Sequence, residues 1–273
     1  MSILITGGKG FIGSQLESYL RGGGHEIVLF NGDISNIESV KNFTSAKQIR
    51  AVIHLAATVS SRSNSLYEKT NIIGTSNILY LCQKLNVERL IFLSSLRVLS
   101  SIKDPYIDSK RQAEKMIVGS GVPYIILRPS MVYGPNDKKN IGFLLKIIKE
   151  KHLVPALDFV FQPLFLKDLL RVIEVCLTVL PNKVFNVPGG QTLSFGEFLN
   201  FVGDCGYKFK IFGWPKINHI LIKIFSYFPF SPVIPSQVDS LFSKEVFNER
   251  SWSRELNIKE TFLKDGLKKI LSA

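Results

Sequence analysis

The segment MSILITGGKGFIG at the start of the chain most constrains its fold, because a glycine-rich loop follows directly on an apolar run. Residues 2–6 predict a buried strand and residues 11–21 predict a helix, with the loop TGGKGFIG between them. A turn of this kind directs backbone N–H groups and the positive end of the helix dipole at one point, where phosphate binds. The segment therefore predicts the first strand and helix of a dinucleotide-binding sheet.

The glycines of this loop follow a GxxGxxG spacing. We expect Gly7 to form the tight turn, Gly10 to let a pyrophosphate approach the backbone, and Gly13 to let helix and strand pack closely. Phe11 and Ile12, at the first turn of the helix, are expected to contact the same cofactor. A turn with a purely structural role is the alternative interpretation of the loop.

The first half of the chain repeats this alternation of short apolar runs and helical patterns. Strands are expected at 26–30, 52–55, 89–93 and 124–127, and helices at 35–43, at 68–85 and from about Tyr106. Apolar strands without polar alternation are buried on both faces, as in a parallel sheet covered by helices. We therefore predict an α/β fold, with a Rossmann-type doubly wound parallel sheet in residues 1–134.

Residues 135–273 predict a smaller, mostly helical substrate-binding domain, and a return of the chain to the sheet domain around 165–190 is left open. The expected elements are helices at 140–151, 166–180 and 194–204 and short strands at 184–186 and 208–212.

The segment 217–234 is apolar, but it contains His219, Lys223, Pro229 and Pro232. A membrane-spanning helix needs about 20 apolar residues, so we predict no transmembrane segment here. We expect the segment to pack on the substrate domain or at a subunit contact, with a homodimer left open. A weak contact with a membrane surface is the alternative.

The composition limits the kinds of binding partner that we expect. Lys and Arg number 34 against 22 Asp and Glu, a net charge of +12, which favours anionic partners. The lysines are dispersed rather than arranged in a stripe with aromatic residues, so we expect no nucleic acid partner. Cys82, Cys176 and Cys205 are far apart and lack a CxxC spacing, so we expect no disulfide framework, no metal site and a reducing, cytoplasmic location. The N-terminal residues show no signal-peptide pattern.

The second expected strand ends in VLFNGDIS, where an acidic residue normally binds the adenosine ribose. Asn31 stands at that place, and we expect Asp33 and Ile34 to serve the adenine instead. A turn or a helix cap before 35–43 is the alternative role of Asp33. Lys9 in the loop and the missing acid favour a 2′-phosphate, so NADP is weakly preferred over NAD.

The segment LSSLRVLSSIKDPYIDSK contains a candidate catalytic group. Tyr106 and Lys110 lie four residues apart at the start of a helix, so they share a face. A nearby ammonium favours phenolate over phenol, which would lower the pKa of the tyrosine from about 10 towards the range of acid–base catalysis. Ser95, at the end of the preceding strand, is placed to hydrogen-bond a substrate oxygen beside that tyrosine.

These features together resemble the extended short-chain dehydrogenases/reductases of the NAD-dependent epimerase/dehydratase family. The resemblance extends over nearly the whole chain. It includes the segments VIHLAA at 52–57, RLIFLSS at 89–95, PYIDSK at 105–110, LRPSMVYGP at 127–135, FLKDLLRVI at 165–173 and VFNVPGG at 184–190.

The resemblance implies a role for each member of the group. Tyr106 would move the proton at a sugar carbonyl or hydroxyl, Lys110 would hold the nicotinamide ribose, and Ser95 would orient the reacting oxygen. Asn71 would support the site from the neighbouring helix. The resemblance also implies that three consecutive residues line the cofactor cleft: Leu55, Ala56 and Ala57.

The same resemblance narrows the reaction. Family members that dehydrate nucleotide sugars carry an acid pair after the catalytic Ser or Thr, whereas this chain has Leu96 and Arg97. The C-terminal half resembles a branch with reductases that make UDP-N-acetyl-6-deoxyhexosamines. We therefore expect an NAD(P)H-dependent reductase of a 4-keto(-6-deoxy) nucleotide sugar, UDP-linked, in bacterial polysaccharide precursor synthesis. The alternatives are a UDP-sugar 4-epimerase and, in another class, a non-catalytic dinucleotide-sensing or nucleic-acid-binding relative.

Substrate contacts are expected at positions where the chain partly departs from the family. Met131 stands where epimerases often place an Asn that contacts the diphosphate, Leu99 replaces a Tyr, and Gln162 replaces an Arg. The expected substrate-binding residues are Ser95, Arg97, Met131, Lys138 and Asn140, with Lys139, Arg128 and Arg171 as further phosphate candidates. We expect Asp168 to be a structural hydrogen-bond partner.

Overall fold

The computed structural model describes residues 1–231, 233–248 and 251–271, so Pro232 of the apolar segment lies outside the described residues. The chain forms two compact units. The first comprises Met1–Leu99, Lys103–Pro129 and Leu170–Asn186, and the second comprises Ser100–Ile102, Ser130–Leu169 and Val187–Ala273. The chain therefore leaves the first unit and later returns to it with residues 170–186.

The first unit is built on a six-stranded sheet with the order β10-β5-β4-β3-β1-β2. The strands are β1 (Ser2–Thr6), β2 (Glu26–Phe30), β3 (Ala51–His54), β4 (Arg89–Leu93), β5 (Tyr124–Pro129) and β10 (Lys183–Val187). Neighbouring strands from β2 to β5 run parallel, and Thr6 lies beside Phe30 on one side and His54 on the other.

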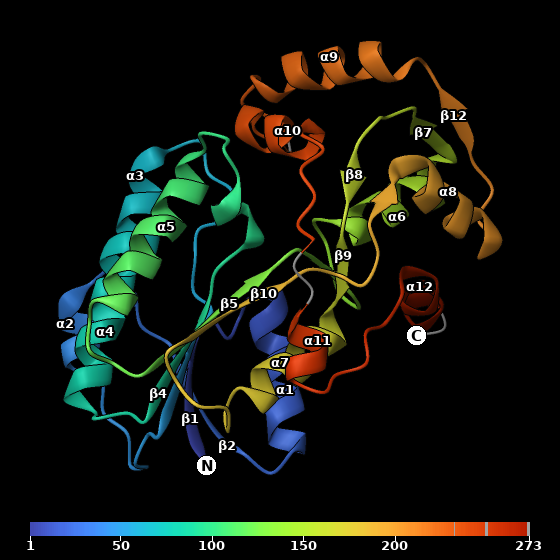
Figure 1. Cartoon of the computed structure of the whole chain (residues 1–273). Coiled ribbons are helices and arrows are strands. Elements are labelled where there is room, and N and C mark those ends of the chain that lie inside the picture. Colours follow the sequence, from blue (N-terminus) through green and yellow to red (C-terminus); the bar gives the residue numbers. More distant parts are fainter. Residues whose placement is uncertain (232, 249–250, 272–273) are drawn as a thin grey trace. The chain divides into compact units, whose positions relative to one another are not determined.

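Helices cover both faces of this sheet (Figure 1). They are α1 (Phe11–Gly22), α2 (Ile37–Lys41), α3 (Asn64–Tyr67), α4 (Gly74–Lys84), α5 (Pro105–Val118) and α7 (Leu166–Val175). Helices α4 and α5 lie on one face, and α1 lies on the other beside α7, where the Tyr19 hydroxyl donates to Glu174 at 2.7 Å. The predicted Rossmann-type doubly wound sheet is confirmed.

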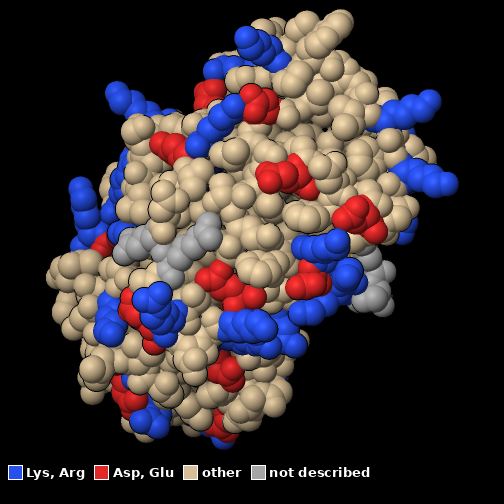
Figure 2. Space-filling model, turned by 45° about the vertical axis from the view of Figure 1, so that its right-hand side comes forward, with Lys and Arg blue, Asp and Glu red and all other residues tan. Residues whose placement is uncertain are grey.

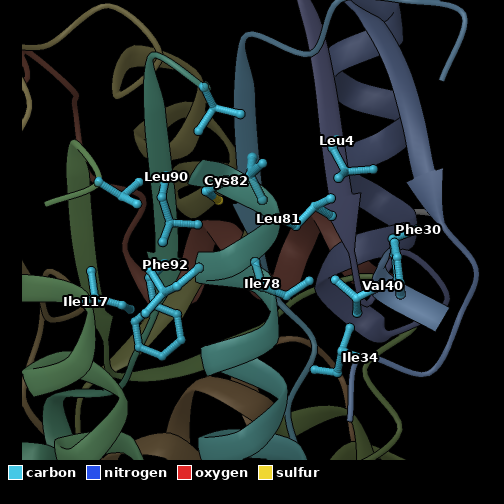
Figure 3. Close-up of a cluster of buried hydrophobic side chains, with 14 of the residues drawn as sticks. Leu4, Phe30, Ile34, Val40, Ile78, Leu81, Cys82, Leu90, Phe92 and Ile117 are labelled. Carbon is cyan, nitrogen blue, oxygen red and sulfur yellow. The ribbon is translucent and has the colours of Figure 1, made fainter. Parts of the chain in front are cut away.

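The core of the first unit explains the apolar strands. All five residues of β1 and all four of β3 are buried, because helices pack on both sides of these strands. On the face covered by α4 and α5, Leu4, Ile78, Leu90 and Phe92 belong to one apolar cluster (Figure 3). This rigid layer fixes the carboxyl ends of the strands, where ligands of open α/β sheets bind.

The helix expected at 68–85 differs from the observed structure. It begins earlier, at α3, passes through a π-helical turn at Glu68–Ile73, and continues as α4. A π turn holds one extra residue, and such turns are frequent at functional sites. Helix α2 is also shorter than the expected 35–43: it starts after Asn36, which accepts from Glu38 N and Ser39 N as the N-cap, and it ends at Lys41.

The second unit contains most of its regular structure in helices. These are α6 (Ile141–Lys151), α8 (Phe195–Asp204), α9 (Pro215–Ser226), α10 (Pro235–Phe242), α11 (Ser251–Glu255) and α12 (Leu263–Leu271). Three strand pairs accompany them: β6 (Met131–Tyr133) with β9 (Pro163–Phe165), β7 (Leu153–Pro155) with β12 (Lys210–Phe212), and β8 (Val160–Phe161) with β11 (Leu193–Ser194). The expected mostly helical C-terminal region is confirmed.

Aromatic side chains form the core of the second unit. Phe159 packs against Phe161 and Phe195, and Phe161 meets Phe198 edge to face, with ring centroids 5.0–5.8 Å apart. Trp252 is fully buried and donates its indole N–H to Pro188 O at 3.2 Å. None of the helices in the described part of the chain is long and apolar enough to cross a bilayer.

Candidate active site

The glycine loop of the first unit has the geometry of a phosphate cradle. Gly7 has φ +73°, and a Cβ there would lie 2.6 Å from Ala56 N, so no other residue fits. A Cβ at Gly13 would collide with the Gly7 carbonyl oxygen. Gly10 is the N-cap of α1 and offers no side-chain acceptor to the helix N-terminus. The N–H groups at the start of α1, at Phe11 and Ile12, are therefore directed towards the space where an anion would sit.

A pocket of about 250 Å³ adjoins this loop. It is lined by Gly7, Gly8, Lys9, Phe30, Asn31, Gly32, Asp33, Ile34 and Ala56. Pockets for whole drug-sized ligands span about 300–1,000 Å³, so this one has room for one end of a dinucleotide. Its lining brings together the loop, the end of β2 and the chain after β3, as the sequence predicts for the adenosine end.

Asp33 lies in the lining of this pocket and also forms a turn. Its Oδ1 accepts from Ser35 N at 2.9 Å and from the Ser35 hydroxyl at 2.7 Å. These hydrogen bonds lower the pKa of the Asp33 carboxyl, so it stays ionised at neutral pH. The turn expected as the alternative for Asp33 is therefore present, whereas the cap is wrong, because Asn36 caps α2.

Helix α5 carries the candidate catalytic tyrosine and lysine, and a buried carboxylate fixes its start. Asp104 is the N-cap and accepts from Tyr106 N at 2.8 Å and from Ile107 N at 3.2 Å, with Pro105 at the first helical position. Asp followed by Pro before a helix is a start signal that the sequence displays. The cap holds Tyr106 rigidly in the first turn.

Tyr106 is half-buried, and the loss of hydration around its hydroxyl raises its pKa to about 12. The Arg97 guanidinium and a hydrogen bond from Ser95 oppose this rise. Arg97 reaches Tyr106 from the 3₁₀ turn Leu96–Leu99, where its Nη2 lies 3.3 Å from Asp104 Oδ2. Arg97 and Ser95 therefore favour the phenolate of Tyr106, whereas Asp104 and Tyr67 add to the rise of its pKa.

Lys110 differs from the expectation that it lowers the pKa of the tyrosine. Its Nζ donates to Leu93 O at 2.8 Å and lies 4.4 Å from the centre of the Phe92 ring. Lys110 is buried, and burial lowers its pKa to about 7, against the opposing charge of Glu114. The cation that lowers the pKa of Tyr106 in this structure is Arg97.

Asn71 connects the catalytic helix with the chain after β3. Its Oδ1 accepts from Thr58 N at 2.8 Å, and its Nδ2 donates to Thr58 O and to the Ser109 hydroxyl, both at 2.9 Å. Ser109 in turn donates to Tyr106 O at 2.7 Å. Asn71 lies in the π-helical turn and is buried, so this turn supplies the support expected from the neighbouring helix.

A buried histidine, which the sequence argument missed, continues this network. Thr75 donates its hydroxyl to Asn71 O at 2.6 Å, so it must accept from His54 Nε2 at 3.1 Å. His54 Nδ1 is then the acceptor of the Thr6 hydroxyl at 2.7 Å. Burial lowers the pKa of His54 to about 3, which keeps this single neutral tautomer.

Arg128, expected as a phosphate candidate, forms its hydrogen bonds with residues of the first unit. Its Nη2 and Nε donate to Glu114 at 2.6 and 3.0 Å, and its Nη1 donates to Asn186 Oδ1 at 3.3 Å. Glu114 also accepts from the Ser94 hydroxyl at 2.5 Å. This buried pair fastens α5 to the sheet. Arg171 lies on α7, close enough to Tyr19 to act on its pKa.

The other substrate candidates lie in the second unit. Met131 begins β6, Lys138 and Lys139 are exposed, and Asn140 caps α6 while donating to Val132 O at 3.1 Å. Asp137 organises this loop, because its carboxylate accepts from the backbone N–H groups of residues 139, 140 and 142. Their role towards a substrate stays a prediction.

Gln162, which departs from the family pattern, and Asp168, expected to be a structural hydrogen-bond partner, both have structural roles in the second unit. Gln162 is buried and exchanges two hydrogen bonds with the Phe247 backbone, at 2.9 and 3.0 Å. Asp168 accepts from Thr261 N at 2.6 Å and from its hydroxyl at 3.0 Å. Both side chains hold the C-terminal part of the chain.

A basic stripe on the surface and a cluster of metal ligands are two further features that would indicate binding beyond this site. On the face shown in Figure 2, Lys and Arg side chains lie among Asp and Glu side chains and form no continuous basic stripe. Among the described residues, no group of three or more His, Cys, Asp or Glu side chains is arranged to hold a metal ion.

Comparisons with known proteins agree with this geometry. The model of the NAD dependent epimerase/dehydratase family matches residues 3–187. A UDP-glucose 4-epimerase of Vibrio cholerae is 27% identical over 241 residues, which cover 72% of this chain and 74% of the relative.

Two solved structures show the same fold. The UDP-glucose 4-epimerase of Thermotoga maritima with UDP-glucose has a TM-score of 0.80 at 21% identity, covering 100% of this chain and 98% of the other. A dTDP-4-dehydrorhamnose reductase of Bacillus anthracis in complex with NADP has a TM-score of 0.72 at 20% identity, covering 80% and 85%.

Proposed function

Because the chain belongs to the NAD dependent epimerase/dehydratase family, we propose that it is an NAD(P)H-dependent reductase acting on the 4-keto group of a nucleotide-linked 6-deoxy sugar. The nucleotide is UDP, and the product serves bacterial polysaccharide synthesis in the cytoplasm. The glycine loop and its pocket fit a dinucleotide, since Gly7 and Gly13 leave no room for a side chain where the backbone must approach a phosphate.

The observation that carries this proposal is the state of Tyr106. Burial raises the pKa of its hydroxyl to about 12, against the lowering effects of the Arg97 charge and of Ser95, so the phenol stays protonated at neutral pH. A reductase needs a proton donor at the start of its reaction, whereas an epimerase starts with a proton acceptor. The resting state of Tyr106 therefore supports reduction.

In the proposed reaction, Tyr106 donates its proton to the carbonyl oxygen of the sugar while Ser95 hydrogen-bonds the same oxygen. A bound reduced nicotinamide supplies the hydride that the carbonyl carbon accepts. Arg97 and Ser95 then stabilise the phenolate left on Tyr106 until solvent protonates it again. Leu96 is fully buried and apolar, so the position after Ser95 offers no acid for a dehydration.

We also propose a preference for NADP over NAD. Lys9 and Asn31 line the pocket at the expected adenosine end, together with the ionised Asp33. Lys9 supplies a cation for a 2′-phosphate, and the amide of Asn31 adds no second negative charge to that of Asp33. Lys9→Ala is expected to weaken NADPH binding about tenfold and to leave NADH binding nearly unchanged. Titrating the wild type and Lys9→Ala with NADPH and with NADH, followed by nucleotide fluorescence, measures this effect. Equal losses of affinity for the two cofactors would refute the preference.

The test of the function is consumption of reduced cofactor. Purified protein, a UDP-4-keto-6-deoxy sugar and NADPH or NADH should show a fall in the nicotinamide absorbance. Tyr106→Phe should lower the rate at least a hundredfold, because the proton donor is gone, with cofactor affinity unchanged. No absorbance change with either cofactor would exclude the reductase, and binding without any turnover would indicate a non-catalytic dinucleotide sensor.

A UDP-sugar 4-epimerase is the second candidate, favoured by the similarity to the Vibrio cholerae protein. Incubation with UDP-GlcNAc and NAD, followed by NMR of the sugar, tests it directly. Appearance of the 4-epimer without net change of the cofactor would replace the reductase assignment.

A further inference from the structure

Helix α9 of the second unit buries polar residues and exposes apolar ones, the opposite of a typical surface helix. The buried residues on this helix are Asn218 and Ser226, both polar. The stripe that faces outward is aliphatic: Ile217, Ile220, Leu221 and Ile224 are exposed by 48–58%. These four residues follow the spacing of one helix face, and we call them the outer face of α9. The expectation that this apolar segment packs on the substrate domain is wrong for these side chains, and the alternative of a subunit contact stays a prediction.

Polar contacts hold α9 in this orientation. Asn218 Nδ2 donates to Ala156 O at 2.9 Å and to Phe212 O at 3.0 Å. The ring of His219 stacks on Phe242, with centroids 3.9 Å apart and planes 10° from parallel. Lys223 forms an ion pair with Asp239 of α10. Turning the outer face inward would break these contacts, so its exposure is built into the unit.

The surroundings of the outer face are basic. No acidic residue occurs from residue 205 to residue 238, whereas Lys208, Lys210, Lys216 and Lys223 lie in this stretch. The apolar area at the top of Figure 2, at the height of α9 in Figure 1, has basic side chains at its border with some acidic side chains beside them. Charge complementarity therefore favours an anionic occupant.

Aromatic side chains stand at both ends of the helix. Trp214 precedes α9 with 71% of its surface exposed, and Tyr227 follows it with 64% exposed. Rings of this kind, apolar with one polar atom, concentrate where hydrocarbon meets water. The 12 residues of α9 extend about 18 Å, too short to cross a bilayer but suited to lie in its surface.

We propose that the outer face of α9, with Trp214 and Tyr227, is an interfacial membrane-binding site that docks the protein on a lipid surface carrying anionic headgroups. A second copy of the chain is a weaker match, because a two-fold contact would bring lysines towards lysines without an acid from this stretch to pair with them. The proposal does not depend on the reaction at Tyr106.

Vesicle co-sedimentation tests the proposal. The wild-type protein should bind vesicles of phosphatidylglycerol and phosphatidylcholine, more weakly in high salt and more weakly to pure phosphatidylcholine. The double variant Ile220→Glu/Ile224→Glu should lower the partition coefficient at least tenfold. Leu180→Glu is the matched control, because Leu180 is 76% exposed in the first unit, and it should bind as wild type.

Tryptophan fluorescence gives an independent readout, since Trp214 is exposed and Trp252 is fully buried. Anionic vesicles should shift the emission of the wild type to shorter wavelength, and Trp214→Phe should abolish that shift. Near-ultraviolet circular dichroism confirms that each variant is folded.

Three outcomes overturn the proposal. They are no vesicle binding by the folded wild type, equal binding by the wild type and the double variant, and a dimer in sedimentation velocity that the double variant dissociates while no protein binds vesicles. The last result would assign the outer face to a second copy.

Discussion

Arg97 is the charged residue that most lowers the pKa of Tyr106, although the catalytic motif does not include it. It lies on a 3₁₀ turn and contacts the buried Asp104 through Nη2, and its buried Nε has no hydrogen-bond partner among the described residues. Its positive charge lowers the pKa of Tyr106 against the effect of burial.

Removal of this charge should therefore change the pH dependence of the reaction. Arg97→Gln raises the pKa of Tyr106 further, so alcohol oxidation, which needs the phenolate, should slow about tenfold at a fixed pH. Reduction should keep its proton donor and lose less. Rates in both directions across pH measure this, and Arg97→Lys, which keeps the charge, is the control; equal losses in both directions would contradict it.

His54 makes the stability of the first unit depend on acid. Burial holds its folded pKa at about 3, below the usual 6.5, so the unfolded chain binds the proton first as the pH falls. Its contribution is intact above pH 6.5 and is lost from there towards pH 3, by about 1.4 kcal/mol per pH unit. Urea unfolding between pH 7 and 5 measures the slope. His54→Gln should flatten it, and an unchanged slope would refute the assignment.

At the residue scale, sequence reasoning locates chemistry better than it assigns partners. The sequence predicts Ser95, Tyr106 and Lys110 as one group because their motif has a fixed spacing, and their catalytic role stays a prediction. The partner of each depends on packing: Lys110 bonds to Leu93 O, and the cation that acts on the tyrosine is Arg97. His54 was missed because an isolated histidine in an apolar strand carries no sequence signal of its hydrogen bonds.

Helix α5 depends on its N-cap for both stability and geometry. Asp104→Ala removes the acceptor of two backbone N–H groups and the partner of Arg97, so we expect a loss of about 1 kcal/mol and a lower kcat. Thermal unfolding and steady-state kinetics measure the two effects. Asp104→Asn keeps the cap without the charge, and it should restore most of the stability; a failure to do so would assign the loss to the ion pair.

At the element scale, strong periodicity was predictable and local irregularity was not. The strands from 2–6 to 89–93 lie within one residue of their expected bounds, because buried parallel strands are continuous apolar runs. The π-helical turn at Glu68–Ile73 has the same apolar spacing as an ordinary helix, and its Asn71 makes a tertiary contact with Ser109 that the spacing does not reveal. The outward face of α9 was hidden likewise, since periodicity shows that a stripe exists but not which way it points.

The accessibility of the three thiols measures whether the whole molecule is folded. Cys82 and Cys176 are buried, and burial raises the pKa of each to about 12, whereas Cys205 is partly exposed. A disulfide-exchange reagent such as DTNB needs an accessible thiolate, so the native protein should react rapidly at one thiol and the denatured protein at three. Cys205→Ser should abolish the rapid phase, and two or more rapid thiols in the native wild type would contradict the burial.

The path of the chain between the two units has a consequence for biosynthesis. The sheet order places β5 between β4 and β10, and β10 is made only after the whole segment Ser130–Leu169 of the other unit. On the ribosome, β5 must therefore wait as an unpaired edge while about 50 further residues emerge. A fragment cut at residue 134 would keep that edge permanently open and should aggregate through it, so the dinucleotide-binding unit can be isolated only with residues 170–186 joined back to it.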